Sequence, residues 1–169
     1  MQGKYHFVCA FGAGVATVAI FHNEFSSLYL GSALVLVGSI VGGLIPDIDS
    51  PTSAFGKPLK PVSKLINKAF GHRTITHSGL WIVPLILLYL YTKNEFVLGY
   101  LIGFVSHLFS DTLTSGGIPW LYPLEKKRLH LTRIKSGDGD MLLTILSIAI
   151  FVLGNFAVRY FMDNPIVSK

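Results

Sequence analysis

Five apolar segments constrain the fold of this 169-residue chain more than any other feature. They cover residues 7–21, 28–45, 79–92, 96–110 and 141–161. A helix that crosses the hydrocarbon core of a membrane needs about 20 residues, within a range of about 17–25. The second and fifth segments reach that length, and the other three must include flanking polar residues to cross. The sequence therefore predicts an all-α, polytopic membrane helical bundle with about five transmembrane helices, forming a single domain over residues 1–169.

The low content of charged residues supports a membrane location. Charged residues make up 14% of the chain, whereas soluble domains carry about 25%. The formal net charge is nevertheless +5, a value that is also found in proteins that bind nucleic acids. Where the basic residues lie along the chain decides between these two explanations.

The basic residues are distributed unequally between the two sides of the predicted bundle. If all five segments cross, one side holds Lys4, Lys57, Lys60, Lys64, Lys68, Arg73, Lys126, Lys127, Arg128, Arg133 and Lys135. The opposite side holds only Lys93, Arg159 and Lys169. Because basic loops remain in the cytoplasm, we expect a cytoplasmic N-terminus and an outward C-terminus. Membrane orientation then accounts for the positive charge, so we expect the lipid bilayer as a partner and no nucleic acid.

Four groups of histidine and aspartate residues adjoin the apolar segments. They are His6, then Asp47 with Asp49, then His72 with His77, and finally His107 with Asp111. The alternating path brings all four groups to the cytoplasmic face, whereas His22 falls on the opposite side. Imidazole and carboxylate ligands without a thiolate cluster suit zinc, manganese or iron. Seven such side chains exceed the needs of one ion, so we predict a centre for two or three divalent ions, with zinc preferred.

Local spacing supports the same reading for some of these groups. His107 and Asp111 are four residues apart, so on a helix they share one face. Pro46 and Pro51 favour an extended backbone between them, on which Asp47 and Asp49 can face the same way. Each group also has a structural explanation, such as a capped helix start or a turn with solvated acids. The case for a metal centre rests on the four groups taken together.

The predicted centre suggests a hydrolytic reaction. Divalent ions in such a site activate water and stabilise negative charge on phosphoryl oxygens. Asp49 or Asp47 is a candidate general base, and Arg73 is placed to neutralise a phosphate or to pair with an aspartate. His130 and Asp140 lie in a polar stretch on the same side and are possible additional site residues. Sequence motifs for serine hydrolases, P-loop proteins and dinucleotide-binding enzymes are absent from the chain.

Three smaller features complete the sequence-based predictions. Residues 61–70 form a possible amphipathic helix, which would either lie on the membrane surface or pack against the bundle. Gly12, Gly14, Gly38, Gly42 and Gly43 are expected at close helix–helix contacts. Cys9 stands alone in an apolar run, so an intramolecular disulfide is excluded and a role in the core is expected.

A signal peptide is the main alternative interpretation of residues 1–21. Lys4 precedes an apolar stretch, and residues 16–19 resemble a cleavage site. Cleavage there would remove His6 from the predicted centre. Sequencing of the mature N-terminus distinguishes the two interpretations.

Several motifs in order along the chain resemble the YdjM-type family of bacterial inner-membrane proteins, which are described as metal-dependent hydrolases. The motifs are Ile45-Pro46-Asp47-Ile48-Asp49-Ser50-Pro51, Gly71-His72-Arg73 with Thr76-His77-Ser78, and Ser106-His107 with Asp111. This resemblance covers roughly residues 3–140, and the family is distantly similar to zinc-dependent phospholipase C and related nucleases. It implies phosphoester hydrolysis with His6, Asp47, Asp49, His72, His77, His107 and Asp111 as metal ligands. Asp140 stands where family members often have glutamate, which puts the role of that position in doubt.

These observations predict a membrane-bound, metal-dependent hydrolase of the bacterial inner membrane. We expect it to cleave a phosphoester bond of a phospholipid or a lipid-linked phosphate at the membrane surface. A membrane metal transporter or a metal-binding sensor is the alternative, although a transporter would carry polar groups near the bilayer midplane. A structural membrane protein whose site has lost activity is a third possibility.

Overall fold

The computed structural model describes residues 3–164, and it is all-helical apart from one isolated bridge between Ile118 and Leu129. Six α-helices follow one another over this range, and short 3-10 helices join several of them. The α-helices are α1 Gly3–Phe21, α2 Leu28–Leu44, α3 Lys60–Phe70, α4 Ile82–Thr92, α5 Glu95–Thr112 and α6 Asp140–Asp163. The prediction of an all-helical fold is therefore confirmed.

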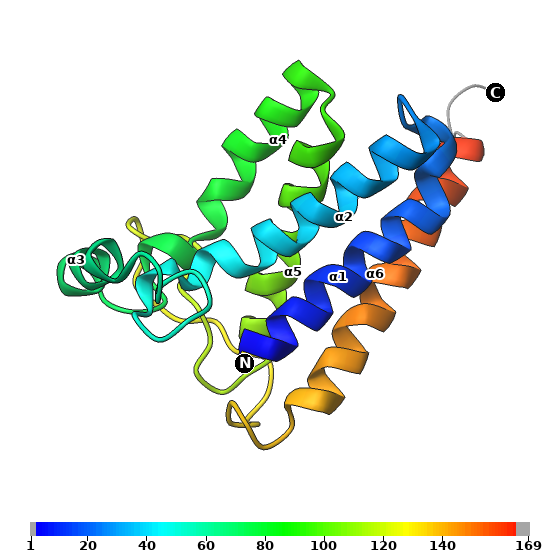
Figure 1. The fold of residues 1–169 in the computed structure, drawn as a ribbon. Coiled ribbons are helices and arrows are strands. Elements are labelled where there is room, and N and C mark those ends of the chain that lie inside the picture. The colour runs from blue at the N-terminus through cyan, green and yellow to red at the C-terminus, as the bar shows by residue number, and fades with distance from the viewer. Residues whose placement is uncertain (1–2, 165–169) are drawn as a thin grey trace.

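The helices form a bundle in which α1, α2 and α5 pack against one another (Figure 1). Helix α6 runs along α1, and α4 forms a hairpin with α5. One end of the bundle holds the start of α1, helix α3 and the long loop 113–139 (Figure 1). The turns between α1 and α2 and between α4 and α5 lie at the opposite end. Below, these two ends are called the loop end and the turn end.

Three stretches within residues 3–164 are long and apolar enough to cross a membrane. They are Gly3–Glu24, Leu28–Asp49 and Asp140–Asp163. A shorter apolar stretch, Gly79–Thr92, contains α4. Helix α5 covers the predicted fourth segment, but its second half carries buried serine, histidine and aspartate residues. The structure thus supports several membrane helices.

Local signals explain where several helices begin and end. Ser27 accepts a hydrogen bond from the backbone N–H of Leu30 and caps α2. Asn94 caps α5 in the same way, and Lys93 ends α4 in the left-handed region with φ of 51°. Pro84 lies in the first turn of α4, where a backbone N–H has no helical partner, so this proline does not interrupt the helix.

Glycines bring the backbones of α2 and α5 into direct contact. A Cβ atom at Gly38 or Gly42 would overlap the carbonyl oxygen of a residue on α5, and a Cβ at Gly103 would overlap the carbonyl oxygen of Ser39. Gly43 lies against the methyl group of Ala10 on α1. The prediction that these α2 glycines mark close helix contacts is confirmed. This close packing sets the position of the second half of α5 relative to the end of α2.

Helix α3 is amphipathic, as predicted for residues 61–70. Val62, Leu65 and Phe70 expose large apolar side chains, and Lys64 and Lys68 lie among them in the sequence. Figure 1 places α3 beside the loop end of the bundle. Cys9 is buried on α1 with Leu113 and Leu143, so its predicted role in the core is also confirmed.

Candidate metal centre

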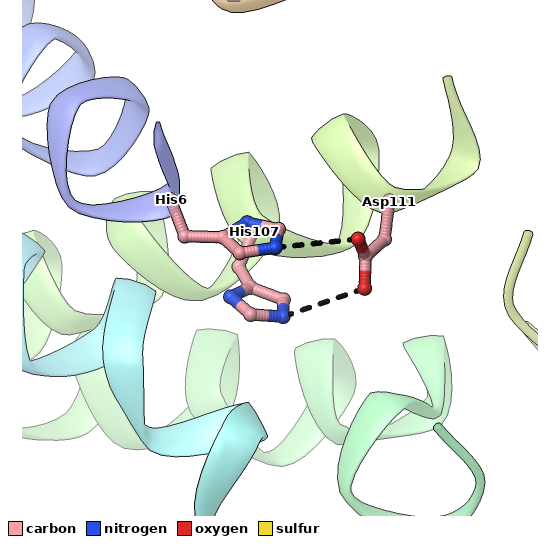
Figure 2. Close-up of side chains that lie close together, drawn as sticks. All are labelled: His6, His107 and Asp111. Atoms are coloured by element: carbon pink, nitrogen blue, oxygen red, sulfur yellow. Dashed lines mark ion pairs between the residues drawn. The ribbon is translucent and has the colours of Figure 1, made fainter. Parts of the chain in front are cut away.

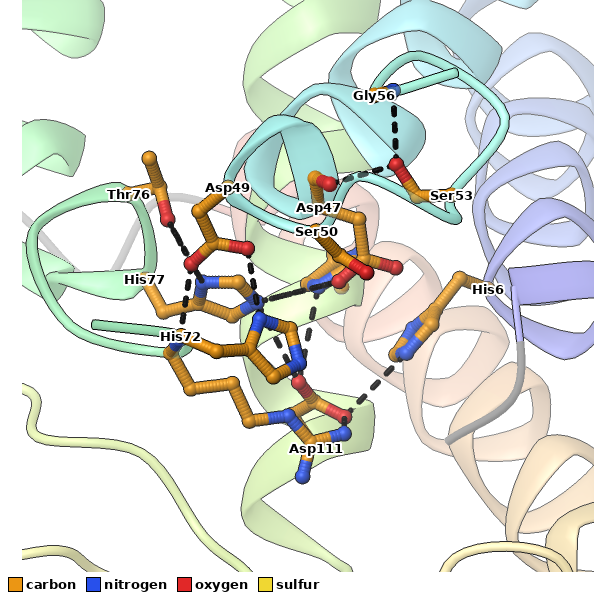
Figure 3. A network of polar contacts seen from close by, with 12 residues as sticks. His6, Asp47, Asp49, Ser50, Ser53, Gly56, His72, Thr76, His77 and Asp111 are labelled. Carbon is orange, nitrogen blue, oxygen red and sulfur yellow. Dashed lines mark hydrogen bonds and ion pairs between the residues drawn. The ribbon is translucent and has the colours of Figure 1, made fainter. Parts of the chain in front are cut away.

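All seven predicted ligands come together at the loop end of the bundle. Figure 2 labels His107, and Figure 3 labels the other ligands. Helix α1 supplies His6, the 3-10 helix η2 (Ile45–Asp49) supplies both aspartates, and α5 supplies His107 and Asp111. His72 lies in the loop after α3, and His77 ends the 3-10 helix η3 (Ile75–His77). Their ligand atoms form three overlapping groups, within each of which the atoms lie within 4.8 Å of one another. These are His6–His107–Asp111, Asp47–His77–His107 and Asp47–Asp49–His72.

The first group is completely buried and joins α1 to α5 (Figure 2). The imidazole rings of His6 and His107 are stacked with centroids 3.8 Å apart. Asp111 lies one turn after His107, as the four-residue spacing predicts. Its Oδ1 is 3.3 Å from His6 Nε2, and its Oδ2 is 3.7 Å from His107 Nε2. The two histidines therefore present the same ring nitrogen to one carboxylate.

The second group joins this buried pair to η2 and η3. His77 Nε2 lies 3.1 Å from His107 Nε2. The Oδ1 atom of Asp47 is 3.6 Å from His77 Nε2 and 3.9 Å from His107 Nε2. Asp111 Oδ2 is also 3.6 Å from His77 Nε2. Two imidazole nitrogens and two carboxylates thus surround one small volume.

In the third group, Asp49 is fixed by three hydrogen bonds. Its Oδ1 lies 2.7 Å from His72 Nδ1. Its Oδ2 accepts bonds of 2.8 Å from the backbone N–H of Arg73 and from the hydroxyl of Thr76. The side chain of Asp49 is fully buried, whereas that of His72 is 44% exposed. Asp49 therefore holds the turn that carries His72 and His77.

The backbone of the two aspartates differs from the extended form that the flanking prolines suggested. Residues 45–49 form the 3-10 helix η2, with Pro46 in its first turn. Proline is compatible with a first helical turn because its missing N–H has no helical partner there. The prediction of an extended backbone is therefore wrong, and both carboxylates nevertheless reach the centre.

The outer nitrogens of His107 and His6 are held by oxygen atoms. His107 Nδ1 lies 2.7 Å from the carbonyl oxygen of Gly43, which can only accept, so Nδ1 carries the hydrogen. His6 Nδ1 lies 2.9 Å from the hydroxyl oxygen of Ser110, and that hydroxyl donates to the carbonyl of His107. The Ser110 oxygen is therefore an acceptor for His6. With the hydrogen of each ring on Nδ1, Nε2 is the nitrogen that faces the centre.

His77 follows the same pattern on the other side of the centre. Its Nδ1 lies 2.9 Å from the hydroxyl of Thr76, which donates its own hydrogen to Asp49. The hydrogen on Nδ1 therefore bonds to Thr76, and Nε2 faces His107. Outer-shell oxygens of this kind fix the tautomer of metal-binding histidines in proteins. Three buried imidazoles are thus oriented with Nε2 toward the carboxylate of Asp111.

A positive charge between these donor atoms would stabilise the arrangement. Lone pairs and carboxylates that lie this close repel one another unless a proton or a cation lies between them. Burial lowers the pKa of His77, but the nearby carboxylates of Asp47 and Asp49 outweigh burial and raise the pKa to about 9. A proton on His77 thus supplies the positive charge that a metal ion would supply. The set of nitrogen and oxygen donors fits a divalent cation.

Arg73 supplies a fixed positive charge beside the centre. Its guanidinium Nη2 donates a 2.7 Å hydrogen bond to Asp111 Oδ1, which confirms the predicted pairing with an aspartate. Its backbone has φ of 58°, a left-handed conformation that costs a non-glycine residue about 1–2 kcal/mol. The bonds to Asp49 and Asp111 hold the residue in that conformation.

A model of the YdjM inner membrane protein family matches residues 1–165 of the chain. The chain belongs to this family. It is 34% identical over 140 residues to the inner membrane protein YdjM of Escherichia coli strain K12, an alignment that covers 79% of this chain and 71% of that protein. It is 35% identical over 126 residues to the uncharacterized protein YvsG of Bacillus subtilis strain 168, covering 73% and 74%. No solved structure matches the chain significantly.

Membership of the YdjM family agrees with the fold. The chain is an inner membrane protein with several candidate transmembrane helices, so the predicted family and location are both confirmed. Its membrane helices imply contact with the lipid bilayer. Its buried histidine and aspartate groups could hold a metal ion.

Two further residues predicted from the sequence lie outside these groups. His130 is exposed in the loop 113–139. Asp140 is buried at the start of α6, the helix whose Leu143 packs against Cys9 of α1. Among residues 3–164, neither belongs to the three groups of ligand atoms.

Sequence reasoning missed the residues that orient the histidines. Ser110 was not predicted, although it lies three residues after His107 and next to Asp111. Thr76 was named only as part of the family motif, and its position beside His77 was the available signal. Gly43 was predicted only as a packing residue, because a backbone carbonyl has no signature in the sequence.

Proposed function

We propose that this chain is a membrane-bound, metal-dependent hydrolase that cleaves a phosphoester bond of a phospholipid or lipid-linked phosphate at the membrane surface. The observation that carries the proposal is the common orientation of three buried histidines, His6, His77 and His107. Each directs Nε2 toward carboxylates, and each has Nδ1 held by an oxygen atom. Histidines held in this way are typical of metal centres, and three histidine ligands occur in catalytic zinc sites.

Zinc is the metal that the donor set favours, with manganese or iron as alternatives. The Nε2 atom of His107 binds one ion at a time, so the two groups that contain His107 share one ion in this proposal. A second ion would then use Asp47 and His72, with Asp49 as a further ligand or as the residue that orients His72. Seven donors are enough for two ions, and a third ion would require shared ligands.

The surrounding side chains have distinct proposed roles. Bound divalent ions would polarise the phosphoryl group and lower the pKa of water. In a centre that holds one ion, His6, His77, His107 and Asp111 suffice as ligands, and Asp47 is then the better candidate for a general base, because its side chain is 13% exposed and it lines a polar cavity. Asp49 is the weaker candidate, because its oxygens already accept three hydrogen bonds. Arg73 would stabilise negative charge on the phosphoryl oxygens.

The direct test is metal analysis combined with a hydrolysis panel on protein purified in neutral detergent. We expect stoichiometric metal in the wild type and turnover of at least one phosphodiester, phosphomonoester or phospholipid. His77→Ala should lose more than about 100-fold in metal affinity, because removal of a ligand exceeds the 10–100-fold cost of losing an outer-shell partner. Turnover should fall with the metal. His130→Ala is the matched control, because His130 is exposed and lies outside the ligand groups.

Two results would contradict this proposal. The first is a wild-type protein without bound divalent metal after purification in buffers that contain zinc and manganese. The second is a His77→Ala protein whose turnover is unchanged.

We also propose that α1, α2, α4, α5 and α6 all cross the membrane, with the loop end in the cytoplasm. The excess of lysine and arginine at that end supports this orientation. Single cysteines at Asn23 and Ser136, in a Cys9→Ala background, test it by labelling with an impermeant maleimide. Both positions are exposed, the first beyond α1 and the second in the loop 113–139. In spheroplasts we expect labelling at position 23 only, and labelling at position 136 would reverse the orientation.

A further inference from the structure

A polar cavity of about 450 Å³ opens beside the candidate metal centre. Two of its lining residues, Asp47 and His72, belong to the ligand groups, and Arg73 lies between the cavity and Asp111. Two lysines, Lys4 and Lys57, complete its charged lining. The volume lies within the range of about 300–1,000 Å³ that is typical of small-molecule sites. A ligand in this cavity would therefore lie directly against the candidate centre.

Lys57 lines the cavity from a loop that is hydrogen-bonded to the backbone of Asp47. Figure 3 shows the bonds that Ser53 forms in this loop. The hydroxyl of Ser53 donates a 2.6 Å bond to the carbonyl of Asp47 and accepts a 2.8 Å bond from the N–H of Gly56. The N–H of Lys57 then donates a 3.0 Å bond to the carbonyl of Ser53. Gly56 is packed so closely that a Cβ atom would overlap the carbonyl oxygen of Ser50. The position of Lys57 is therefore tied to that of Asp47.

Lys4 approaches the cavity from a different element. It lies in the first turn of α1, two residues before His6, and its ammonium group is 4.9 Å from the centroid of the Tyr5 ring. Within residues 3–164, neither Lys4 nor Lys57 forms an ion pair with an acidic side chain. Both ammonium groups are thus available to a ligand. The cavity lining holds three cationic side chains and a single carboxylate, that of Asp47.

We propose that this cavity binds the phosphate group of the substrate, and that Lys57 and Lys4 determine the preference for an anionic substrate. A phosphate group carries up to two negative charges and three strong acceptor oxygens. Arg73 would contact it beside the metal centre, and the two lysines would contact it from α1 and the loop 50–59. This inference rests on the proposed hydrolase function and names the residues that would select its substrate.

The test measures binding of two probes to zinc-loaded protein in neutral detergent by titration calorimetry. The probes are inorganic phosphate and dioctanoyl phosphatidic acid, and zinc content is measured on the same samples. Both lysines are exposed. We expect Lys57→Ala to weaken phosphate binding roughly fivefold and the double Lys4→Ala, Lys57→Ala variant roughly 20-fold, the upper end of what exposed charge-assisted hydrogen bonds contribute. Lys57→Arg should restore binding. Lys64→Ala is the matched control, since Lys64 is an exposed lysine on α3 away from the cavity lining.

The outcomes separate this inference from the proposed function. Zinc-bound wild type that fails to bind both probes, or Lys57→Ala that binds them normally, overturns the phosphate site and leaves the metal centre intact. An equal loss in Lys64→Ala also overturns it, because general surface charge would then explain binding. Protein that lacks zinc but binds phosphate through Lys57 contradicts the hydrolase and supports the cavity. Tighter binding of phosphatidic acid supports the site with a lipid headgroup as its ligand, and equal binding supports it with a soluble phosphate.

Discussion

Replacement of His107 with alanine is expected to lower metal affinity by more than about 100-fold. The variant removes a direct ligand, and loss of an outer-shell partner alone already costs about 10–100-fold. His107 belongs to two of the three ligand groups, and its Nε2 faces both His77 and Asp111. The variant also leaves the carbonyl of Gly43 without its hydrogen-bond donor, which costs about 1–3 kcal/mol of folding free energy. Affinity is measured by competition with a zinc chelator, and folding is checked by thermal denaturation.

A graded set of variants separates ligand loss from general damage. Ser110→Ala keeps every ligand and removes the hydroxyl that holds His6 Nδ1 and donates to the carbonyl of His107. It should therefore weaken binding by about 10–100-fold. His22→Ala, at the turn end of the bundle, should have no effect. Equal metal affinity in the His107→Ala and His22→Ala proteins would rule out a centre built on His107.

Gly103→Ala is expected to destabilise the protein by about 1–3 kcal/mol or more, the usual range for overpacking a close contact. The new methyl group would overlap the carbonyl oxygen of Ser39, which is a backbone atom that cannot rotate away. Helices α2 and α5 would have to separate. This movement would lengthen the contact between Gly43 on α2 and His107 on α5, so metal affinity should fall as well. Thermal denaturation in detergent measures the first effect and chelator competition the second.

Gly154→Ala is the matched control for this prediction. Gly154 lies on α6, and a Cβ atom there has no neighbouring heavy atom within 4 Å. Alanine also favours a helix over glycine by up to about 1 kcal/mol. The control protein should therefore be as stable as the wild type or slightly more stable. If Gly103→Ala matched it, direct contact between the two backbones would be excluded.

Much of the fold follows from patterns that the sequence displays directly. Long apolar runs predict membrane helices because the hydrocarbon core excludes unpaired backbone groups. The sequence also predicted that distant residues such as His6 and Asp111 come together. Helices that cross a membrane in alternating directions place the start of the first and the end of the fourth on the same side. The close contacts at Gly38 and Gly42 could be predicted for a similar reason, since small residues recur where membrane helices meet.

Other features depend on tertiary contacts that no local pattern encodes. The prolines at positions 46 and 51 are compatible with an extended segment and equally with the 3-10 helix that the structure contains. The left-handed backbone of Arg73 is held by Asp49, which lies 24 residues away in the sequence. Asp140 shares a residue type with the ligands, but α6 packs along α1 and places it near Cys9 instead. Composition alone could not separate these cases.

The pairing of His6 with Ser110 has a consequence for the order in which the protein is made. These two residues are separated by 104 positions in the chain. Helices α1 and α2 therefore leave the ribosome well before the part of α5 that completes the site, and domains are generally built from the N-terminus onward. A nascent or truncated chain that ends before residue 107 lacks both His107 and Asp111, two of the seven donors. Metal could accordingly bind only after the first five helices have packed together. Bound metal would then distinguish the assembled protein from incomplete chains in the membrane.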